Sequence, residues 1–478
     1  MKKGDLIDLE IEKYAFEGKG IAKIEKVLTG EENNNKKYVV FVDGSYPGDK
    51  VKAEIKKIKK SYAEAKRRQI ISPSTFRTKP KCKFFGECGG CKQQDLDYRQ
   101  QIKFKQQQVQ EIFEKMGGFR NLVIENIIPS EKIFYYRNKM EFSFSNNRWL
   151  TTEEINSGKE LKKDFALGLH VPQNYEKVLD IDECFLQSEI SNQILNFTRN
   201  FFVGKQASVY STKNNEGFLR NLVIKQPVHS KDLMVNLVTL GENVELLNDY
   251  SDSMIKSFPQ ISTIVNNINL KKAAVAIGDY EKIYYGDGFI FDSIGNFKFR
   301  ISANSFFQTN TLQAEKLYQT AMEFAEPNKN EIIYDLYAGT GTISIYFSGN
   351  AKEIYSFESI DSAIKDGEEN LRINKIDNIK FFLTDLNKSF INICIENKIP
   401  KPDTIILDPP RSGVHKNTIK DIIELNPKKI IYVSCNPTTQ TRDVKLLTDT
   451  GYNLIKMKPV DMFPHTFHIE NVALLIKQ

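Results

Sequence analysis

The C-terminal part of the chain alternates short apolar runs with helix-like segments, and this alternation constrains the fold more than any other feature. Strands that alternate with helices predict an α/β domain with a parallel sheet. In such sheets the carboxyl ends of the strands meet at one edge, where ligands bind. Five runs end in polar or glycine-containing turns: EIIYDLYAGTG (331–341), EIYSFES (353–359), IKFFLTDLN (379–387), DTIILDPPRSG (403–413) and KIIYVSCNP (429–437).

The first two turns contain the residue types of a nucleotide site. Gly339 and Gly341 let the backbone turn tightly and approach a ligand closely. Glu358 ends the second strand, where a carboxylate can accept both ribose hydroxyls of an adenosine ligand. A dinucleotide dehydrogenase would carry a third spaced glycine, but residue 344 is Ser. With acids also ending the next two strands, this order resembles the class I S-adenosylmethionine (SAM) methyltransferase fold.

Cys435 ends the fifth predicted strand, at the same edge of the sheet. A free cysteine is commonly a buried structural residue, but such a residue would more naturally lie within a strand. Methylation of uracil at C5 requires a thiolate, because addition to C6 makes C5 carbanion-like. A base must then remove the C5 proton. We favour Glu470, whose burial before a terminal strand would raise its pKa, with His468 as the second candidate.

Five ordered motifs resemble those of the bacterial RNA (uracil-5)-methyltransferase family: SANSFFQTN (302–310), DLYAGTG (335–341), LDPPRSG (407–413), YVSCNP (432–437) and HIENV (468–472). The resemblance implies Cys435 as the nucleophile and Glu470 as the general base. Thr342 stands where many members carry Asn, and Arg411 would either orient its loop or contact RNA. The resemblance further implies a SAM site lined by Gln308, Tyr337, Thr342, Glu358, Asp385 and Asp408.

Four further cysteines form a pattern of their own: Cys82, Cys88 and Cys91 in a C-x5-C-x2-C spacing, and the distant Cys184. In a cytosolic protein this pattern favours metal ligation over disulfides. Four thiolates suit an iron–sulfur cluster or structural zinc, and spacing does not decide between them. The family resemblance favours a [4Fe–4S] cluster with a structural or RNA-positioning role, with zinc as the lesser alternative. Cys394 is expected to be an ordinary core residue.

Residues 1–70 alternate apolar and polar residues between glycine turns, which predicts a small antiparallel β-barrel with a polar hairpin tip at 31–37. Residues 1–80 hold 19 Lys and Arg against 12 Asp and Glu, and the whole chain has a net charge of +6. This basic excess fits a module that binds phosphates, although charge alone is equally consistent with a solvated lysine-rich surface. The barrel resembles a TRAM domain, an OB-like RNA-binding module.

The sequence thus predicts three regions: a TRAM-like barrel at 1–70, a central α+β domain for RNA and the iron–sulfur cluster at 78–300, and a catalytic Rossmann-like α/β domain at 301–478. The predicted reaction is SAM-dependent methylation of uridine C5 in RNA. The barrel and cluster favour 23S ribosomal RNA over transfer RNA, which is the alternative substrate. The target base must be flipped out of its stack, and Phe306 or Phe307 could stack on it or belong to the core.

Other classes of function fit the motifs less well. An amino-group methyltransferase would carry an aromatic residue at position 411, and a 5-methylcytosine enzyme would carry Pro-Cys after the fourth strand. A non-catalytic RNA-binding or ribosome-assembly factor would not need Cys435 and Glu470. No apolar stretch approaches the roughly 20 residues of a membrane-spanning helix, and the first ten residues do not read as a signal peptide. We expect a cytoplasmic monomer that binds RNA but neither DNA nor membranes.

Overall fold

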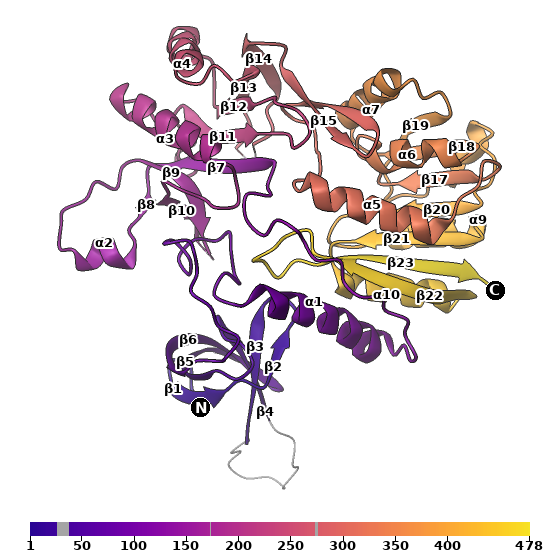
Figure 1. The fold of residues 1–478 in the computed structure, drawn as a ribbon, viewed down its shortest axis with the longest axis horizontal. Coiled ribbons are helices and arrows are strands. Elements are labelled where there is room, and N and C mark those ends of the chain that lie inside the picture. Colours follow the sequence, from indigo (N-terminus) through magenta and orange to yellow (C-terminus); the bar gives the residue numbers. More distant parts are fainter. Residues whose placement is uncertain (26–37, 173, 273–275) are drawn as a thin grey trace.

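The computed structural model describes residues 1–25, 38–172, 174–272 and 276–478. Figure 1 shows a small barrel at the bottom left, a central region at the upper left and an α/β domain at the right. The hairpin tip predicted at 31–37 lies outside the described residues. Within those residues, no helix has the length and apolar character needed to cross a membrane.

The N-terminal barrel wraps six strands around one apolar core that includes Val40, Val51 and Ile55. Its sheet order is β1-β5-β6-β4-β3-β2, in which β4 and β6 pair in parallel and the other neighbours are antiparallel. Burial alternates along the strands, as period-2 patterning predicts. The strands are β1 Leu6–Glu10, β2 Lys13–Ala15, β3 Lys19–Ile24, β4 Tyr38–Asp43, β5 Lys50–Ile58 and β6 Tyr62–Ser72.

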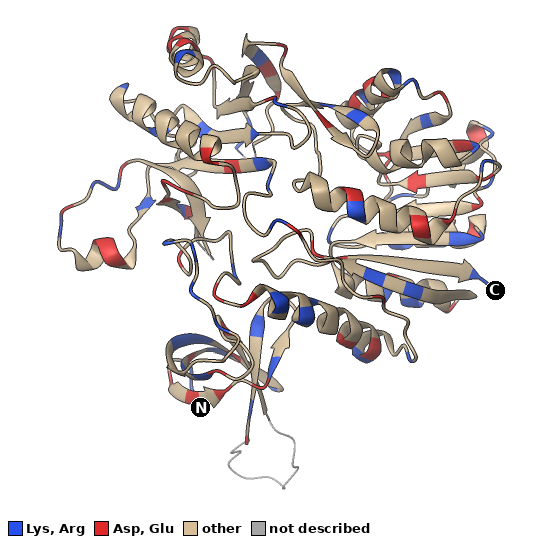
Figure 2. Ribbon diagram, in the orientation of Figure 1, with Lys and Arg blue, Asp and Glu red and all other residues tan. Residues whose placement is uncertain are grey.

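Lysine and arginine follow β5 and β6 in Figure 2, where the sequence has its densest basic run. Acids on the same strands neutralise part of this run, since Glu54 pairs with Lys56 at 2.7 Å and also with Arg68. Lys59 and Lys60 remain exposed at the end of the strand pair. The barrel therefore presents a basic edge that is partly balanced by its own carboxylates.

A helix connects the barrel to the rest of the chain. α1 (Tyr98–Ile112) begins at Asp97, whose side chain accepts a hydrogen bond from the backbone N–H of Arg99. It continues into a π-helical turn (Phe113–Gly117) and ends at Gly118 in the left-handed conformation. The sequence places this helix in the central domain at 78–300. In the structure it packs against α10 and β22 of the catalytic domain instead, because its apolar face completes the core of that domain.

The central region is a mixed eight-stranded sheet in the order β14-β13-β12-β11-β7-β9-β10-β8. Helices α3 and α4 pack on one face, where Phe142, Ile194 and Leu247 share a core. The elements are β7 Lys139–Ser145, β8 Arg148–Trp149, α2 Thr152–Asn156, β9 Ala166–Val171, β10 Asn174–Asp180, α3 Glu189–Gly204, β11 Leu219–Lys225, β12 Met234–Thr239, α4 Val244–Ser257, β13 Thr263–Ile268 and β14 Tyr280–Tyr285.

The catalytic domain is built on a seven-stranded sheet in the order β19-β18-β17-β20-β21-β23-β22. Strands β17 to β21 are parallel to one another. β23 lies between β21 and β22 and is antiparallel to both. The strands are β17 Ile332–Leu336, β18 Glu353–Glu358, β19 Ile379–Leu383, β20 Thr404–Leu407, β21 Lys429–Ser434, β22 Tyr452–Val460 and β23 Glu470–Lys477. This is the predicted α/β architecture of a SAM methyltransferase.

Helices cover both faces of this sheet, as Figure 1 shows. They are α5 Thr311–Ala325, α6 Thr342–Phe347 with a 3-10 turn at Ser348–Asn350, α7 Asp361–Asn374, α8 Ile391–Glu396, α9 Lys416–Leu425 and α10 Pro437–Thr448. A hairpin of β15 (Phe289–Ile294) and β16 (Phe297–Ser302) packs on α7. The boundary predicted between residues 300 and 301 therefore falls inside a strand of this hairpin.

Candidate active site

The strand order gathers most of the predicted site residues at one edge of the catalytic sheet. Glu358 ends β18, the glycine turn follows β17, and Asp408 follows β20. Cys435 follows β21, and Glu470 begins β23, which runs in the opposite direction beside it. Because these strands are direct neighbours, side chains far apart in sequence face one edge.

The glycine turn and Glu358 form one half of a ligand site. Gly339 has a φ of +57°, and a side chain built there would meet nothing within 4 Å, so the turn borders open space. Its backbone N–H donates to Glu358 Oε2 at 2.8 Å. The backbone N–H groups of Ser359 and Ile360 donate to Oε1 at 2.6 and 2.9 Å. The turn thereby fixes the carboxylate at the strand end, where it can still accept hydroxyl groups of a ligand.

Gln308, Thr342 and Asp408 form the other half, around Tyr318, which no sequence motif indicated. The Tyr318 hydroxyl lies 2.9 Å from Thr342 Oγ1, and the charge of Asp408 and a hydrogen bond with Gln308 also affect its pKa. Burial raises the pKa of Tyr318, so the hydroxyl stays neutral and can donate. Desolvation also raises the pKa of Asp408 to about 7.

Tyr337 and Asp385 lie at the outer side of this edge. Tyr337 has a φ of +69°, which is uncommon for a residue with a side chain. Its hydroxyl lies beside Thr418 and the backbone of His415, at the start of α9. Asp385 is exposed, and the backbone N–H of Asn387 lowers its pKa. Its negative charge acts on Tyr337, which places the two predicted contacts near each other.

Cys435 and Glu470 face each other across two neighbouring strands. The antiparallel register pairs Ser434 with Asn471, so one step further along places Cys435 opposite Glu470. Burial, the Glu470 carboxylate and Asp408 raise the pKa of the Cys435 thiol to about 11 against the lowering effect of Arg411. Burial, with a smaller effect of Asp408, raises the pKa of Glu470 well above its usual range. A partly buried thiol and a buried carboxyl group with a raised pKa therefore lie at the same edge.

Arg411 is the cation of this group. Its Nη2 lies 2.8 Å from His468 Nδ1, and its positive charge lowers the pKa of Cys435, Glu470 and His468. Its carbonyl accepts a hydrogen bond from Asn436 Nδ2 at 3.0 Å, which ties its loop to the one after Cys435. Burial and Arg411 lower the pKa of His468 to about 3. His468 is therefore neutral and serves as a partner of Arg411.

The segment before Glu470, which we call the base loop (residues 461–469), is held by distant parts of the chain. At its start, Lys105 of α1 and Asp461 form a buried ion pair at 2.5 Å. The Tyr98 hydroxyl donates to the same carboxylate at 2.7 Å. The Tyr136 hydroxyl donates to the carbonyl of Pro464 at 3.1 Å. The base loop is thus anchored at several points before it reaches Glu470.

His465 is the centre of this anchorage. The backbone N–H groups of Lys92 and Gln93, just after the third predicted cluster cysteine, donate to its carbonyl at 2.8 and 3.0 Å. The Gln101 side chain accepts from the His465 backbone N–H at 2.9 Å and contacts Nδ1 at 3.2 Å. The ring also packs on Phe134, with centroids 4.4 Å apart. The cysteine-rich loop and the base loop are therefore in direct contact.

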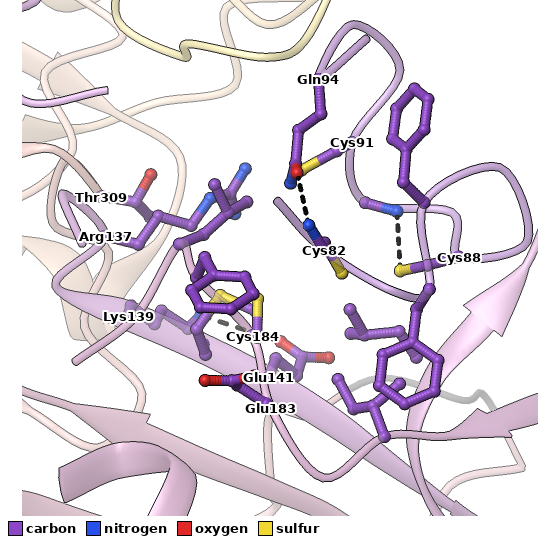
Figure 3. Close-up of a pocket in the computed structure, with 18 residues that line it drawn as sticks. Cys82, Cys88, Cys91, Gln94, Arg137, Lys139, Glu141, Glu183, Cys184 and Thr309 are labelled. Atoms are coloured by element: carbon purple, nitrogen blue, oxygen red, sulfur yellow. Dashed lines mark hydrogen bonds and ion pairs between the residues drawn. The ribbon is translucent and has the colours of Figure 1, made fainter. Parts of the chain in front are cut away.

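The four predicted metal ligands line one pocket of ≈ 260 Å³, which we call the cysteine pocket (Figure 3). Burial raises the pKa of all four thiols, to about 11 for Cys88 and about 12 for Cys91. Gln94 Nε2 donates to the Cys91 sulfur at 3.2 Å. Among the residues that the structure describes, no three His, Cys, Asp or Glu side chains approach closely enough to hold a single metal ion.

Comparisons with known proteins agree with this geometry. A family model described as tRNA (Uracil-5-)-methyltransferase matches residues 269–478, and a TRAM domain model matches residues 2–66. An uncharacterized RNA methyltransferase of Chlorobaculum tepidum is 39% identical over 475 residues, which cover 99% of this chain and 96% of that protein. The chain belongs to the RNA (uracil-5-)-methyltransferase family. This methyltransferase is SAM-dependent, and its N-terminal barrel is a TRAM domain.

Two further relatives extend over nearly the whole methyltransferase. An uncharacterized RNA methyltransferase of Bacteroides thetaiotaomicron is 39% identical over 464 residues, which cover 96% of this chain and 99% of that protein. The crystal structure of Pyrococcus abyssi tRNA (uracil-54, C5)-methyltransferase in complex with S-adenosyl-L-homocysteine superposes with a TM-score of 0.73 at 29% identity. That match covers 98% of this chain and all of the archaeal chain.

The two adjacent phenylalanines, Phe306 and Phe307, differ in solvent exposure. Phe306 is 66% exposed, whereas Phe307 is buried and packs on Phe299. Phe306 is therefore the side chain that can stack on a base, and Phe307 belongs to the core. Cys394 is buried in the core, as the sequence predicts. The anchors of the base loop, Gln101 and Lys105, had no signal in the sequence beyond being polar residues of a helix.

Proposed function

We propose that the methyltransferase acts on uridine C5 through a covalent bond between Cys435 and C6 of the base. The observation that carries the proposal is the register of β21 and β23, which sets Cys435 opposite Glu470 beside Arg411. A nucleophile, a base and a cation at one sheet edge are the three groups that the reaction requires.

The steps follow from these groups. The Cys435 thiolate adds to C6, and the electron pair of the 5,6 double bond moves toward O4 as an enolate. Arg411 is the cation available to stabilise negative charge. C5 then forms a bond to the methyl group that SAM would supply, and the methyl–sulfur bond breaks to leave S-adenosyl-L-homocysteine. The Glu470 carboxylate removes the C5 proton, the double bond forms again, and the thiolate of Cys435 leaves.

The site also suits the charge of the methyl donor. SAM carries a positive sulfonium group, and Asp408 and Glu470 provide carboxylates at the edge between the predicted cofactor contacts and Cys435. We propose that Gln308, Tyr337, Thr342, Glu358, Asp385 and Asp408 line the SAM site, with Glu358 accepting the ribose hydroxyls. Tyr318 joins them because its hydroxyl faces Gln308, Thr342 and Asp408.

We propose a [4Fe–4S] cluster in the cysteine pocket, held by Cys82, Cys88, Cys91 and Cys184. All four cysteines line one pocket of ≈ 260 Å³. Four thiolates suit either a cluster or zinc, and the family resemblance favours the cluster, with zinc as the lesser alternative. Because the loop after Cys91 holds His465 of the base loop, the group would have a structural role.

The RNA substrate is 23S ribosomal RNA in our proposal, with transfer RNA as the second candidate. The basic barrel and the cysteine pocket favour ribosomal RNA by resemblance. The archaeal tRNA enzyme, however, matches 98% of this chain, so the presence of the N-terminal region does not by itself separate the two substrates. Cytoplasmic location and a monomeric state remain expectations from the sequence.

A trapping experiment tests the mechanism and the substrate together. The full chain is incubated with SAM and either 23S RNA fragments or transfer RNA transcripts that contain 5-fluorouridine. Fluorine at C5 cannot leave as a proton, so the adduct should persist on a denaturing gel and peptide mapping should place it on Cys435. Cys435→Ala should form no adduct. Glu470→Gln should retain an adduct even on ordinary uridine, because proton removal is blocked.

The outcomes separate the alternatives. An adduct with ribosomal fragments alone supports the first substrate, and one with transfer RNA alone supports the second. Methyl transfer without an adduct at Cys435 would overturn the covalent mechanism. SAM binding without methyl transfer to either RNA would favour a non-catalytic RNA-binding role.

A further inference from the structure

A second cavity lies in the central region, and the catalytic proposal does not use it. Its volume is ≈ 640 Å³. We call it the amide pocket, after the asparagines in its lining. It is formed by β7, β9, β10 and β11 together with residues 210–213. Alternation along β7 explains much of its polarity: Met140 and Phe142 contribute to the core under α3 and α4, whereas Glu141 and Ser143 line the pocket. Phe144 belongs to the same core and also lines the pocket.

The floor of the amide pocket is a fixed row of hydrogen-bonding groups. Asn221 Nδ2 donates to Ser143 Oγ at 3.2 Å, and Ser143 Oγ lies 2.9 Å from His170 Nε2. These three side chains come from β11, β7 and β9, which are adjacent strands of the sheet. Their positions are therefore set by the sheet itself, and a planar ligand would meet donors and acceptors at fixed places.

One wall is a stacked pair of planar groups. The Arg220 guanidinium lies over the Tyr210 ring, 4.1 Å from its centroid. Arg220 Nη1 donates to the carbonyls of Asn269 and Lys271 at 2.8 and 2.7 Å, which holds the guanidinium in place. Both Arg220 and Tyr210 are buried. A rigid planar wall of this kind suits an aromatic ring.

The charges in the lining indicate the class of ligand. Glu141 and Glu176 stand against Lys213 and Arg220, so the pocket is close to neutral. Two carboxylates would repel a polyphosphate, whereas they can accept hydrogen bonds from the amino group of a base. Lys213 is exposed at the rim, where a single phosphate could lie. This combination fits one nucleotide, with its base inside and its phosphate outside.

The amide pocket adjoins the sites already described. Glu141 and Leu169 line both it and the cysteine pocket. The backbone N–H of Gly89, between two of the predicted cluster ligands, donates to the carbonyl of His170 at 3.3 Å. The cysteine pocket in turn reaches Thr309, the neighbour of Gln308 in the proposed SAM site. The three sites therefore follow one another from the catalytic domain into the central region.

We propose that the amide pocket binds a second unstacked nucleotide of the RNA substrate, separate from the uridine at Cys435. This inference rests on the proposed function. Proteins read structured RNA mainly through splayed nucleotides, whose bases stack on aromatic rings or guanidinium planes and form hydrogen bonds at their edges. The amide pocket offers both kinds of contact. It would contribute to the choice of RNA, while the catalytic edge carries out the chemistry.

Photocrosslinking of the full chain tests this proposal. The probes are 23S RNA fragments and transfer RNA transcripts that contain 4-thiouridine and 6-thioguanosine, and crosslinked peptides are mapped after nuclease digestion. We expect crosslinks in residues 141–147 and 210–221. Ser211→Trp should fill the mouth of the pocket, remove these crosslinks and weaken RNA binding by roughly tenfold or more, the size expected for losing one stacked base. Ser257→Trp on α4, on the other face of the sheet, is the matched control.

A second pair of variants uses smaller substitutions, so that a loss of binding is not caused by misfolding. Lys213→Ala should weaken RNA binding more than Lys256→Ala, because only the first lysine lies at the pocket rim. SAM binding should be unchanged in all four variants. If RNA is bound and methylated without crosslinks in these peptides, the amide pocket does not bind a nucleotide, and the proposed function still holds. Equal affinity of Ser211→Trp and Ser257→Trp would lead to the same conclusion.

The opposite result is equally distinguishable. Crosslinks in the amide pocket, lost in Ser211→Trp, with no methyl transfer to any uridine would support the nucleotide site and overturn the proposed function. A chain that binds neither kind of RNA would overturn both.

Discussion

The catalytic edge and the cysteine pocket both contain partly buried thiols, but they depend on the fold in different ways. At the catalytic edge, consecutive strand ends place Cys435 opposite Glu470 by sheet register alone. In the cysteine pocket, a loop supplies three thiols and Cys184 supplies the fourth, and the pocket between them is open. The first group of side chains is positioned by one sheet, whereas the second lines a pocket of ≈ 260 Å³ for which we propose a bound cluster.

The largest expected effect is the loss of the nucleophile at the catalytic edge. Cys435→Ala should lower methyl transfer by about 10³-fold or more, since covalent activation of the base is lost. SAM affinity should stay within about twofold by calorimetry, because the proposed adenosine contacts lie at β17 and β18. A variant that kept one tenth of the methyl transfer, measured with labelled SAM, would show that the edge is not organised around Cys435.

The second prediction concerns the pH dependence of the same thiol. Because burial, Glu470 and Asp408 raise the pKa of Cys435 to about 11, little thiolate is present at neutral pH in the free chain. Alkylation of Cys435 by iodoacetamide should rise about tenfold per pH unit from pH 7 to about pH 10. Peptide mass spectrometry measures the rate. Arg411→Ala should slow it at every pH by raising the pKa further, and a plateau near pH 8 would contradict the predicted environment.

The third prediction removes the group expected in the cysteine pocket. Cys88→Ser with Cys91→Ser should abolish stoichiometric iron and sulfide in anaerobically purified protein. The melting temperature should fall by several degrees, because the group no longer crosslinks the loop to Cys184. Cys394→Ala, which removes a core thiol elsewhere, should retain iron even if it melts earlier. One zinc ion per chain in the unaltered protein, without iron or sulfide, would contradict the cluster and support zinc as the bound group.

The smallest effect is expected where α1 and the cysteine-rich loop contact the base loop. Gln101→Leu removes the side chain that accepts a hydrogen bond from the His465 backbone and contacts its ring. Methyl transfer should fall about tenfold, because Glu470 would be misplaced. Formation of the 5-fluorouridine adduct should be affected less than release of methylated product, because Cys435 is not part of the base loop. Gln101→Glu keeps the oxygen that accepts from His465 and should recover part of the rate. Equal losses in adduct formation and product release would indicate general destabilisation instead.

The sequence predicted the position of a site residue best where a single local pattern determines it. Glu358, Asp408 and Cys435 could be placed together because each follows a strand of an α/β repeat, and strand ends share an edge. Tyr318 could not be placed, because its role depends on where α5 packs. Gln101 and Lys105 lie more than 350 residues from their partners in the base loop. No periodicity encodes such pairs, so the sequence could not predict that α1 packs against α10 and β22.

The anchorage of the base loop also has a consequence for biosynthesis. Residues 461–470 leave the ribosome more than 300 residues after α1 and the cysteine-rich loop. Lys105 is buried in the folded protein, and among the described residues its carboxylate partner is Asp461. An unpaired charge is costly to bury, so α1 cannot dock fully on a nascent chain. A product truncated before residue 461 would therefore lack both the proposed general base and a stably docked α1.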